Sequence, residues 1–139
     1  MTHMNEELFE VVDRMGRVIG QATRRQCHGD PGLIHQVVHV LVFDRQGRLF
    51  LQKRSAAKDV QPGRWDTSVG GHMQPGEKPM QSALRELSEE LGVSGVRLDP
   101  AYEYLWESPV ETELVRTFVT LYEGPFRLQA EEISEGRFW

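Results

Sequence analysis

The sequence contains a single cysteine, Cys27, among its 139 residues. One cysteine excludes an internal disulfide and any metal cluster that needs several thiolates, and it favours a reducing, cytoplasmic compartment. The sequence also lacks any apolar run close to the ~20 residues that span a bilayer. Its amino end, MTHMNEELFE, lacks the basic and then apolar pattern of a signal peptide. We therefore expect a cytoplasmic protein with no membrane partner.

Positive charge is scarce as well. The chain has 16 Lys and Arg residues against 21 Asp and Glu residues, for a net charge of −5. Nucleic-acid polymers are bound mainly by clustered Lys and Arg side chains, so this balance argues against a nucleic-acid partner. A small phosphorylated substrate remains compatible with it, because such a ligand needs only a local cation or a metal ion.

Repeats, low-complexity tracts and linkers rich in Pro or Ser are missing too, so no feature divides the chain. Apolar residues make up 39% and charged residues 27%, as in ordinary globular proteins. A chain of this length fits one domain with its own core. We expect a single domain over residues 1–139.

Runs of β-prone residues separated by turn residues predict most of the secondary structure. Residues 8–23 are expected to form a hairpin, and residues 35–54 a second strand pair around a turn at 44–47. The segment 55–77 is rich in Gly and Pro, which predicts a long functional loop. Further strands are expected at residues 96–106, 113–124, 126–129 and 133–139.

One strong helix is predicted between this loop and the later strands. Pro79 suits its first turn and Gly92 its C-terminal end. At 100° per residue, one stripe of the helix is apolar and the opposite side carries three glutamates. The apolar stripe consists of Met80, Leu84, Leu87 and Leu91, and the glutamates are Glu86, Glu89 and Glu90.

The glutamates of this helix repel one another. Glu86 and Glu90 stand at i,i+4, and the dipole at the helix C-terminus disfavours anions. A solvated acidic face is the plain interpretation, but a divalent cation would relieve the repulsion, and hard cations such as Mg²⁺ or Mn²⁺ bind carboxylates. Gly70 and Gly71 precede the helix, where they permit close approach and expose carbonyl oxygens. Loop and helix together predict a metal site.

The segment GHMQPGEKPMQSALRELSEELGV, from Gly71 to Val93, resembles the Nudix box, G-x(5)-E-x(7)-R-E-U-x-E-E-x-G-U, where U is a bulky aliphatic residue. It matches at every fixed position, which makes a solvated acidic face a poor explanation. The matching residues are Gly71, Glu77, Arg85, Glu86, Leu87, Glu89, Glu90, Gly92 and Val93.

The resemblance implies an α/β/α sandwich with a mixed β-sheet and a Nudix loop-helix. It also implies Mg²⁺-dependent hydrolysis of a nucleoside diphosphate linked to another group, or of a related diphosphate, with Mn²⁺ as an alternative ion. The implied metal ligands are Glu86, Glu90, Glu89 and the carbonyl of Gly70. The implied catalytic residues are Glu89, which helps to activate the attacking water, Arg85, which orients a glutamate, and Glu77, which braces the loop.

Segments outside the box resemble the Nudix branch that contains isopentenyl-diphosphate isomerase. They include GLIHQVVHVLVF and LQKRSAAKDVQPGRWDTSVGGH, so the resemblance covers nearly the whole chain. It places His35 and His72 at the isomerase's metal-binding histidines, and Glu111 and Glu113 at its acidic positions, with Glu113 as a further expected metal ligand. For His35, a hydrogen-bonded core histidine is the favoured interpretation, and strand glutamates are usually solvated.

Two departures favour hydrolysis over isomerisation. Gly70 stands where the isomerase motif carries its active-site cysteine, and the box is intact here but degraded in the isomerase. Allylic isomerisation stays the main alternative. A domain that senses a nucleotide without cleaving it is a second alternative, which the intact box disfavours.

Side chains around the loop are candidates for substrate binding. His72 is a candidate for contact with the substrate or a metal ion, and a structural role explains it equally. We expect one or two of Lys53, Arg54, Lys58 and Arg64 to contact diphosphate oxygens, whereas loop solvation explains the others. Aromatic residues offer stacking surfaces but more often belong to the core. They are Trp65, Tyr102, Tyr104, Trp106 and Phe118.

The resemblance leaves the substrate and the oligomeric state open, although homodimers are common among Nudix proteins. The chain stops at EEISEGRFW, where many relatives continue into a further helix. The chain is either a short member or a truncated one.

Overall fold

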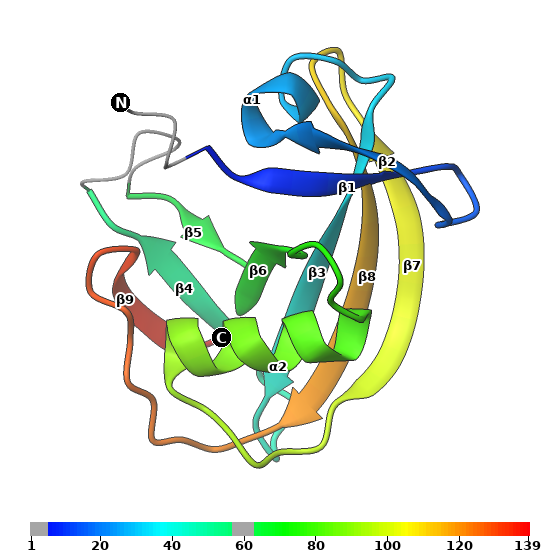
Figure 1. Cartoon of the computed structure of the whole chain (residues 1–139). Coiled ribbons are helices and arrows are strands. Elements are labelled where there is room, and N and C mark those ends of the chain that lie inside the picture. The colour runs from blue at the N-terminus through cyan, green and yellow to red at the C-terminus, as the bar shows by residue number, and fades with distance from the viewer. Residues whose placement is uncertain (1–5, 57–62) are drawn as a thin grey trace.

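Two β-sheets organise the computed structural model, which describes residues 6–56 and 63–139 (Figure 1). The larger, six-stranded sheet has the order β2-β1-β3-β8-β7, with β6 also paired to β3, and the smaller sheet has the order β5-β4-β9. The strands of the larger sheet are β1 (Leu8–Val12), β2 (Val18–Thr23), β3 (Ile34–Phe43), β6 (Val69–His72), β7 (Asp99–Glu107) and β8 (Thr112–Leu121). Those of the smaller sheet are β4 (Phe50–Arg54), β5 (Trp65–Asp66) and β9 (Ile133–Phe138).

The centre of the larger sheet is the parallel pair of β3 and β8. The two strands stay in register from Ile34 beside Thr112 to Phe43 beside Leu121. Antiparallel strands flank them, β7 on β8 and β6 on β3, so the sheet is mixed. The predicted α/β class with a mixed sheet is confirmed.

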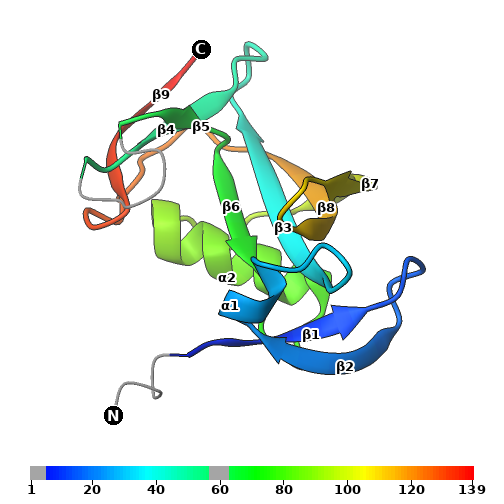
Figure 2. The ribbon, with the colours of Figure 1, turned by 90° about the horizontal axis from the view of Figure 1, so that it is seen from above.

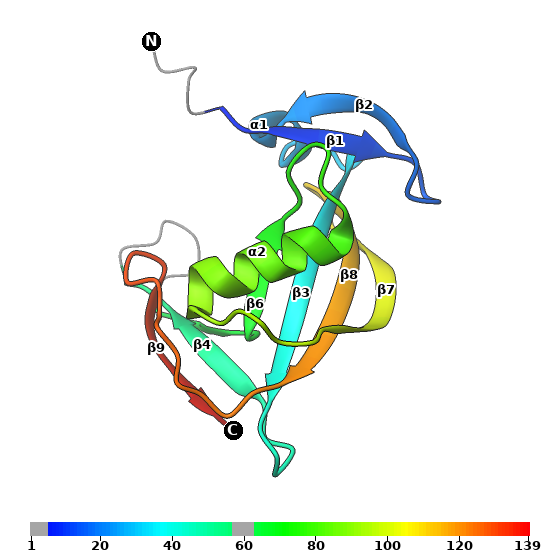
Figure 3. The same cartoon turned by 60° about the horizontal axis from the view of Figure 1, so that its bottom comes forward.

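Helix α2 (Pro79–Leu91) covers one face of β3 and β6 (Figure 3). It begins at a proline and ends at Gly92, whose φ of 67° lies in the left-handed region, as predicted. Its buried side is formed by Ser82, Ala83, Leu87 and Leu91. Leu84 is 39% exposed, so its predicted place in the apolar stripe is wrong. The face that meets the sheet runs through Ala83, Leu87 and Leu91, at i,i+4 spacing, and leaves Leu84 to the side.

The predicted hairpin over residues 8–23 is confirmed as β1 and β2. A short helix, α1 (Arg24–Cys27), follows it, and Cys27 is buried there. Figure 2 shows that the hairpin and α1 lie at one end of β3, whereas β4, β5 and β9 lie at the other. Within residues 6–56 and 63–139, no helix has the length and apolarity that crossing a membrane requires.

Two predictions about strands are corrected. β3 and β4 meet only through the bridge between Phe43 and Leu49, because β4 joins the second sheet. The segment 126–129 is not a strand. Its amides at Arg127 and Gln129 instead donate to the carbonyls of Leu91 and Glu90, at the C-terminal end of α2.

The predicted loop over 55–77 contains both β5 and β6, so it is only partly irregular. Lys58, a predicted substrate contact, lies outside the described residues. The pairing of β6 with β3 is what carries Gly70 and His72 to the centre of the sheet, where Gly70 lies opposite His39 and His72 opposite Val37.

Candidate active site

A cavity of about 660 Å³ lies between the sheet, α2 and the segments that carry Glu7 and Arg24. This volume is in the range of small-molecule binding sites, roughly 300–1,000 Å³. Many of the predicted site residues line it: Gly70, His72, Arg54, Arg64, Arg85, Glu86, Glu90 and Glu113. Lys53, Glu77 and Glu89, which are also described, are not among the lining residues.

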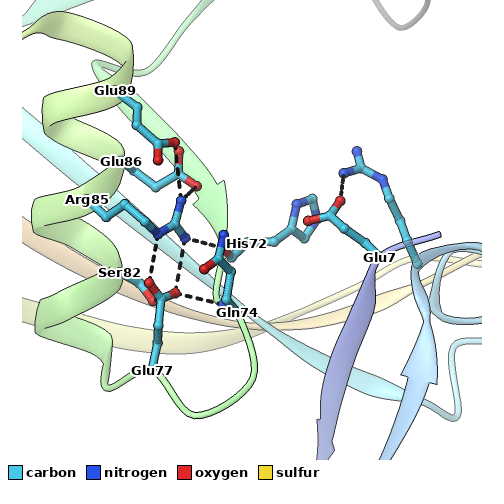
Figure 4. A network of polar contacts seen from close by, with 9 residues as sticks. Glu7, His72, Gln74, Glu77, Ser82, Arg85, Glu86 and Glu89 are labelled. Atoms are coloured by element: carbon cyan, nitrogen blue, oxygen red, sulfur yellow. Dashed lines mark hydrogen bonds and ion pairs between the residues drawn. The ribbon is translucent and has the colours of Figure 1, made fainter. Parts of the chain in front are cut away.

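Arg85 is the centre of a hydrogen-bond network between α2 and the loop before it (Figure 4). Its Nε donates to Glu77 Oε2 at 2.7 Å and its Nη2 to Glu77 Oε1 at 3.1 Å. Nη2 also donates to the carbonyl of His72 at 3.1 Å, and Nη1 to Glu86 at 3.1 Å and to Glu89 at 3.3 Å. One guanidinium therefore ties β6, the loop and two glutamates of α2 together.

Glu77 receives further hydrogen bonds from the same loop. The amide of Gln74 donates to its Oε1 at 2.7 Å, and the Ser82 hydroxyl donates to the same atom. The hydrogen bond from Arg85 lowers the pKa of Glu77 to about 2, against the opposing effect of burial. Glu77 is therefore ionised at neutral pH. These hydrogen bonds fit the prediction that Glu77 braces the loop. Its role in catalysis stays a prediction.

Glu86 and Glu90 point toward the edge of β6. A Cβ atom at Gly71 would overlap the carboxyl group of Glu86 and lie 2.7 Å from its Cγ, so only glycine leaves room for this carboxylate. Gln52 Nε2 donates to Glu90 Oε1 at 2.8 Å. Burial raises the pKa of Glu90 to about 9, and the hydrogen bond with Glu86 adds to the rise. A divalent cation at this pair would replace the proton that burial favours.

Glu89 differs from these two carboxylates. Its side chain is 51% exposed and accepts a hydrogen bond from Arg85 Nη1. Its predicted roles in metal binding and water activation stay predictions.

A second group of possible metal ligands lies deeper in the same region. The ligand atoms of His28, His35 and His72 all lie within 4.8 Å of one another, and so do those of His35, Glu111 and Glu113. His35 Nε2 is 3.4 Å from Glu113 Oε2 and 3.5 Å from Glu111 Oε1. Three imidazoles and two carboxylates therefore converge, a donor set that suits Zn²⁺ or Mn²⁺.

Unpaired buried atoms support this interpretation. His28 Nε2, both ring nitrogens of His35 and Glu111 Oε1 are buried and lack a hydrogen-bond partner among the described residues. Such atoms normally cost free energy unless an ion or a water molecule satisfies them. Burial lowers the pKa of His72 to about 3 and also lowers the pKa of His28, which leaves both rings neutral, the form that binds metals.

The main chain explains why these five residues meet. The parallel register places His35 directly beside Glu113, and the β3–β6 pairing brings His72 to the same face. His28 comes from the end of α1. The ring of Phe9 stacks on His35 and His72, with centroids 5.3 and 4.7 Å apart, and fixes their planes.

The aromatic residues divide into two groups. Phe118 is buried, as predicted for the core, whereas Trp65, Tyr102, Tyr104 and Trp106 are 37%, 56%, 40% and 44% exposed. The core prediction is therefore wrong for these four. Tyr104, Trp106 and Trp65 line the cavity.

Sequence reasoning missed two residues of the site. Gln52 gave no signal, because a single glutamine in a strand carries no pattern. His28 could have been suspected as a third histidine shortly before His35. Cys27 is buried, and burial raises the pKa of its thiol, which disfavours the reactive thiolate.

Comparisons with known proteins identify the family of this chain. A family model described as "NUDIX domain" matches residues 33–139. An isopentenyl-diphosphate Delta-isomerase of Streptomyces avermitilis is 41% identical over 137 residues, which cover 94% of this chain and 70% of that protein. An uncharacterized Nudix hydrolase of Pseudomonas aeruginosa, PA4841, is 39% identical over 132 residues, covering 95% and 78%. The crystal structure of DR0079 from Deinococcus radiodurans matches with a TM-score of 0.81 and 26% identity, covering 95% of this chain and 82% of that one.

The fold and the site thus define a protein with a carboxylate-bearing helix packed on a mixed sheet. The chain belongs to the Nudix family and is a Nudix hydrolase. The predicted fold is confirmed by the structural match, and the predicted likeness to the isomerase branch by the relatives.

Gly71→Ala is expected to separate activity from stability. The new methyl group displaces the Glu86 carboxylate, which is the end of a flexible side chain, so we expect a loss of activity of about 100-fold with a change in the free energy of unfolding of only about 1 kcal/mol. Steady-state kinetics and urea unfolding measure the two effects. Gly20→Ala is the control, because a Cβ at Gly20 meets no atom within 4 Å. Full activity of Gly71→Ala would contradict the proposed position of Glu86.

Glu77→Gln is expected to destabilise the fold by about 2 kcal/mol at pH 7, because it removes charge-assisted hydrogen bonds from Arg85. The folded-state pKa of about 2 lies below the ordinary 4.5, so this stabilisation is present above pH 4.5 and is lost as the pH falls toward 2. Urea unfolding of both proteins across this window measures the difference, with Glu131→Gln, an exposed residue, as the control. If the difference in free energy of unfolding between the wild-type protein and Glu77→Gln stays constant down to pH 2, the lowered pKa of Glu77 is refuted.

Proposed function

We propose that this Nudix hydrolase cleaves a diphosphate linkage in a small phosphorylated compound, with the help of divalent cations. Water attacks one phosphorus atom, the bond from that phosphorus to the bridging oxygen breaks, and the second phosphate leaves with the electron pair. The observation that carries the proposal is the Glu86–Glu90 pair, held beside Gly71 in a cavity that Arg54 and Arg64 also line.

The donor atoms fit two kinds of cation. Glu86 and Glu90 would hold Mg²⁺ or Mn²⁺, with the Gly70 carbonyl and Glu89 as further predicted ligands. The group of His28, His35, His72, Glu111 and Glu113 would hold a softer divalent ion. When bound, such cations neutralise diphosphate charge and lower the pKa of water.

The protein's own residues position the reaction. Arg85 donates one hydrogen bond to Glu86, two to Glu77 in the preceding loop and one to the carbonyl of His72 at the end of β6. Gln52 donates to Glu90 and also to the carbonyl of Ser68, so this carboxylate is fixed from β4. Arg54 and Arg64 offer positive charge to the diphosphate oxygens. A protein nucleophile is unnecessary, and the buried Cys27 agrees with that.

Glu90→Gln is expected to abolish hydrolysis, with kcat reduced by 100-fold or more, because the amide cannot replace an anionic ligand. The measurement is phosphate release from nucleotide sugars, dinucleotides, nucleoside triphosphates and prenyl diphosphates in the presence of Mg²⁺. Glu135→Gln, on the exposed side of β9, is the matched control. Inactivity of the wild-type protein across the whole panel would contradict hydrolysis.

Isomerisation of isopentenyl diphosphate is the second candidate function. The five converging His and Glu residues favour it, together with a 41% identical relative that is named for this activity. Gly70 argues against it, because the cysteine of the isomerase motif is absent.

Deuterium exchange separates the two candidates. With isopentenyl diphosphate in D₂O, we expect no incorporation of deuterium into the carbon skeleton, because Gly70 supplies no thiol for proton transfer. Mass spectrometry of the recovered compound measures the incorporation. Incorporation without phosphate release would overturn the hydrolase proposal and establish the isomerase.

A further inference from the structure

Strand β3 carries a second histidine, His39, that belongs to neither donor set of the site. It lies on the same face of the sheet as His35, because the two residues are four positions apart on one strand. Its side chain lines the cavity, but among the described residues its ring nitrogens are not part of the converging His and Glu ligand atoms. His39 is therefore a polar group of the cavity to which the site so far gives no role.

The imidazole of His39 is half-buried and has no protein partner. Within residues 6–56 and 63–139 its side chain forms no hydrogen bond or ion pair, and its nitrogens are not among the buried unpaired atoms, so the cavity reaches them. Burial lowers the pKa of His39, against the opposing charges of Glu113 and Asp66, which leaves the ring neutral at pH 7. A neutral imidazole offers one N–H donor and one acceptor nitrogen to a ligand.

Gly70 keeps this ring open to the cavity. The two residues lie directly opposite each other in the antiparallel pair of β3 and β6. A Cβ atom at Gly70 would lie 3.3 Å from Cδ2 and 3.6 Å from Nε2 of His39, so a side chain there would press on the ring and cover that nitrogen. Residue 70 is also where the isomerase motif carries its cysteine. In this chain an imidazole instead of a thiol faces the cavity at that point.

Only the bare backbone of β6 separates His39 from the carboxylates of α2. A Cβ at Gly70 would meet His39, whereas a Cβ at Gly71 would overlap the carboxyl group of Glu86 on the other face. His39, Glu86 and Glu90 line the same cavity. A diphosphate at this strand has the carboxylates on one side and the imidazole on the other. The carboxylates act on it through a cation, whereas the imidazole can contact it directly.

We propose that His39 binds the diphosphate of the substrate directly, with its ring N–H donating a hydrogen bond to a phosphate oxygen. This inference rests on the proposed diphosphate hydrolysis and adds a binding residue that lies outside the Nudix box. The hydrogen bond is charge-assisted, because the acceptor oxygen is anionic. It needs no proton transfer to or from the ring.

The surroundings of the ring favour an anionic oxygen as its partner. Glu113 and Asp66 act on His39 through their charges, but within the described part of the chain neither forms a hydrogen bond or an ion pair with it. Arg54 lines the same cavity and offsets the repulsion between these carboxylates and a diphosphate. An alkyl group at this place would cover the N–H without pairing it, which costs free energy.

Binding of methylene diphosphonate tests the contact, because this compound keeps the diphosphate oxygens but is not hydrolysed. With excess Mg²⁺, we expect His39→Leu to bind it about 10-fold or more weakly, since a hydrogen bond to a charged group is lost. His39→Gln keeps an N–H donor and is expected to bind within about 3-fold of the wild-type protein. Calorimetry measures the affinities. Gln21→Leu, on the exposed part of β2, is the matched polar-to-apolar control.

Gly70→Ala provides a second variant that leaves His39 in place. Its methyl group presses on the imidazole, so we expect weaker diphosphonate binding in the wild-type background. In the His39→Leu background the same change is expected to have no further effect, because the contact is already lost. Equal effects of Gly70→Ala in both backgrounds would show that it acts without His39 and would overturn the inference.

The binding measurement keeps this inference separate from the proposed function. Diphosphonate binding that depends on His39 supports the inference even if the wild-type protein hydrolyses no member of the substrate panel. Three results overturn it: no diphosphonate binding by the wild-type protein, unchanged binding by His39→Leu, or an equal loss in His39→Leu and His39→Gln. A loss of Mg²⁺ affinity without diphosphonate in His39→Leu would make His39 a metal ligand and would also overturn it.

Discussion

The parallel pairing of β3 with β8 is the constraint on which the site depends. It sets His35 beside Glu113 and Val37 beside Val115, and a slip of one residue would turn each of these side chains to the opposite face of the sheet. The alternate residues Val38, Val40 and Val42 are buried under α2, so their burial enforces the register. The apolar packing that holds α2 on the sheet therefore also aligns the polar side chains on the opposite face of the sheet.

A second constraint brings the helix to this face. Arg85 ties the loop to α2, and Gly71 lets Glu86 approach the edge of β6 without steric conflict. The carboxylates of α2 and the histidines of the sheet thus open to one cavity although they belong to opposite sides of β6. Two donor sets of different chemistry therefore lie close together there: a carboxylate set, which suits Mg²⁺, and an imidazole-rich set, which suits a softer ion.

Short-range sequence patterns predicted the structural features that depend on interactions within a few residues. The helix over 79–91, its capping residues, the first hairpin and the spacing of the glutamates follow from periodicity and turn chemistry, which act over a few residues. Leu84 was placed wrongly, because which residues of an amphipathic helix meet the sheet depends on how the sheet lies. β4 was paired wrongly with β3, because the sheet that a strand joins is settled by distant partners such as β9.

The sequence alone determined the family, because the Nudix box lies within one continuous stretch, and it predicted a carboxylate metal site from the helical spacing of the glutamates. The tertiary structure alone decided which distant residues share the site. His28, Gln52 and the exposed aromatic residues Tyr104 and Trp106 come from separate parts of the chain, and only strand register and sheet order bring them to the cavity or to the residues that line it. Such contacts join residues far apart in the chain, so no short-range pattern records them.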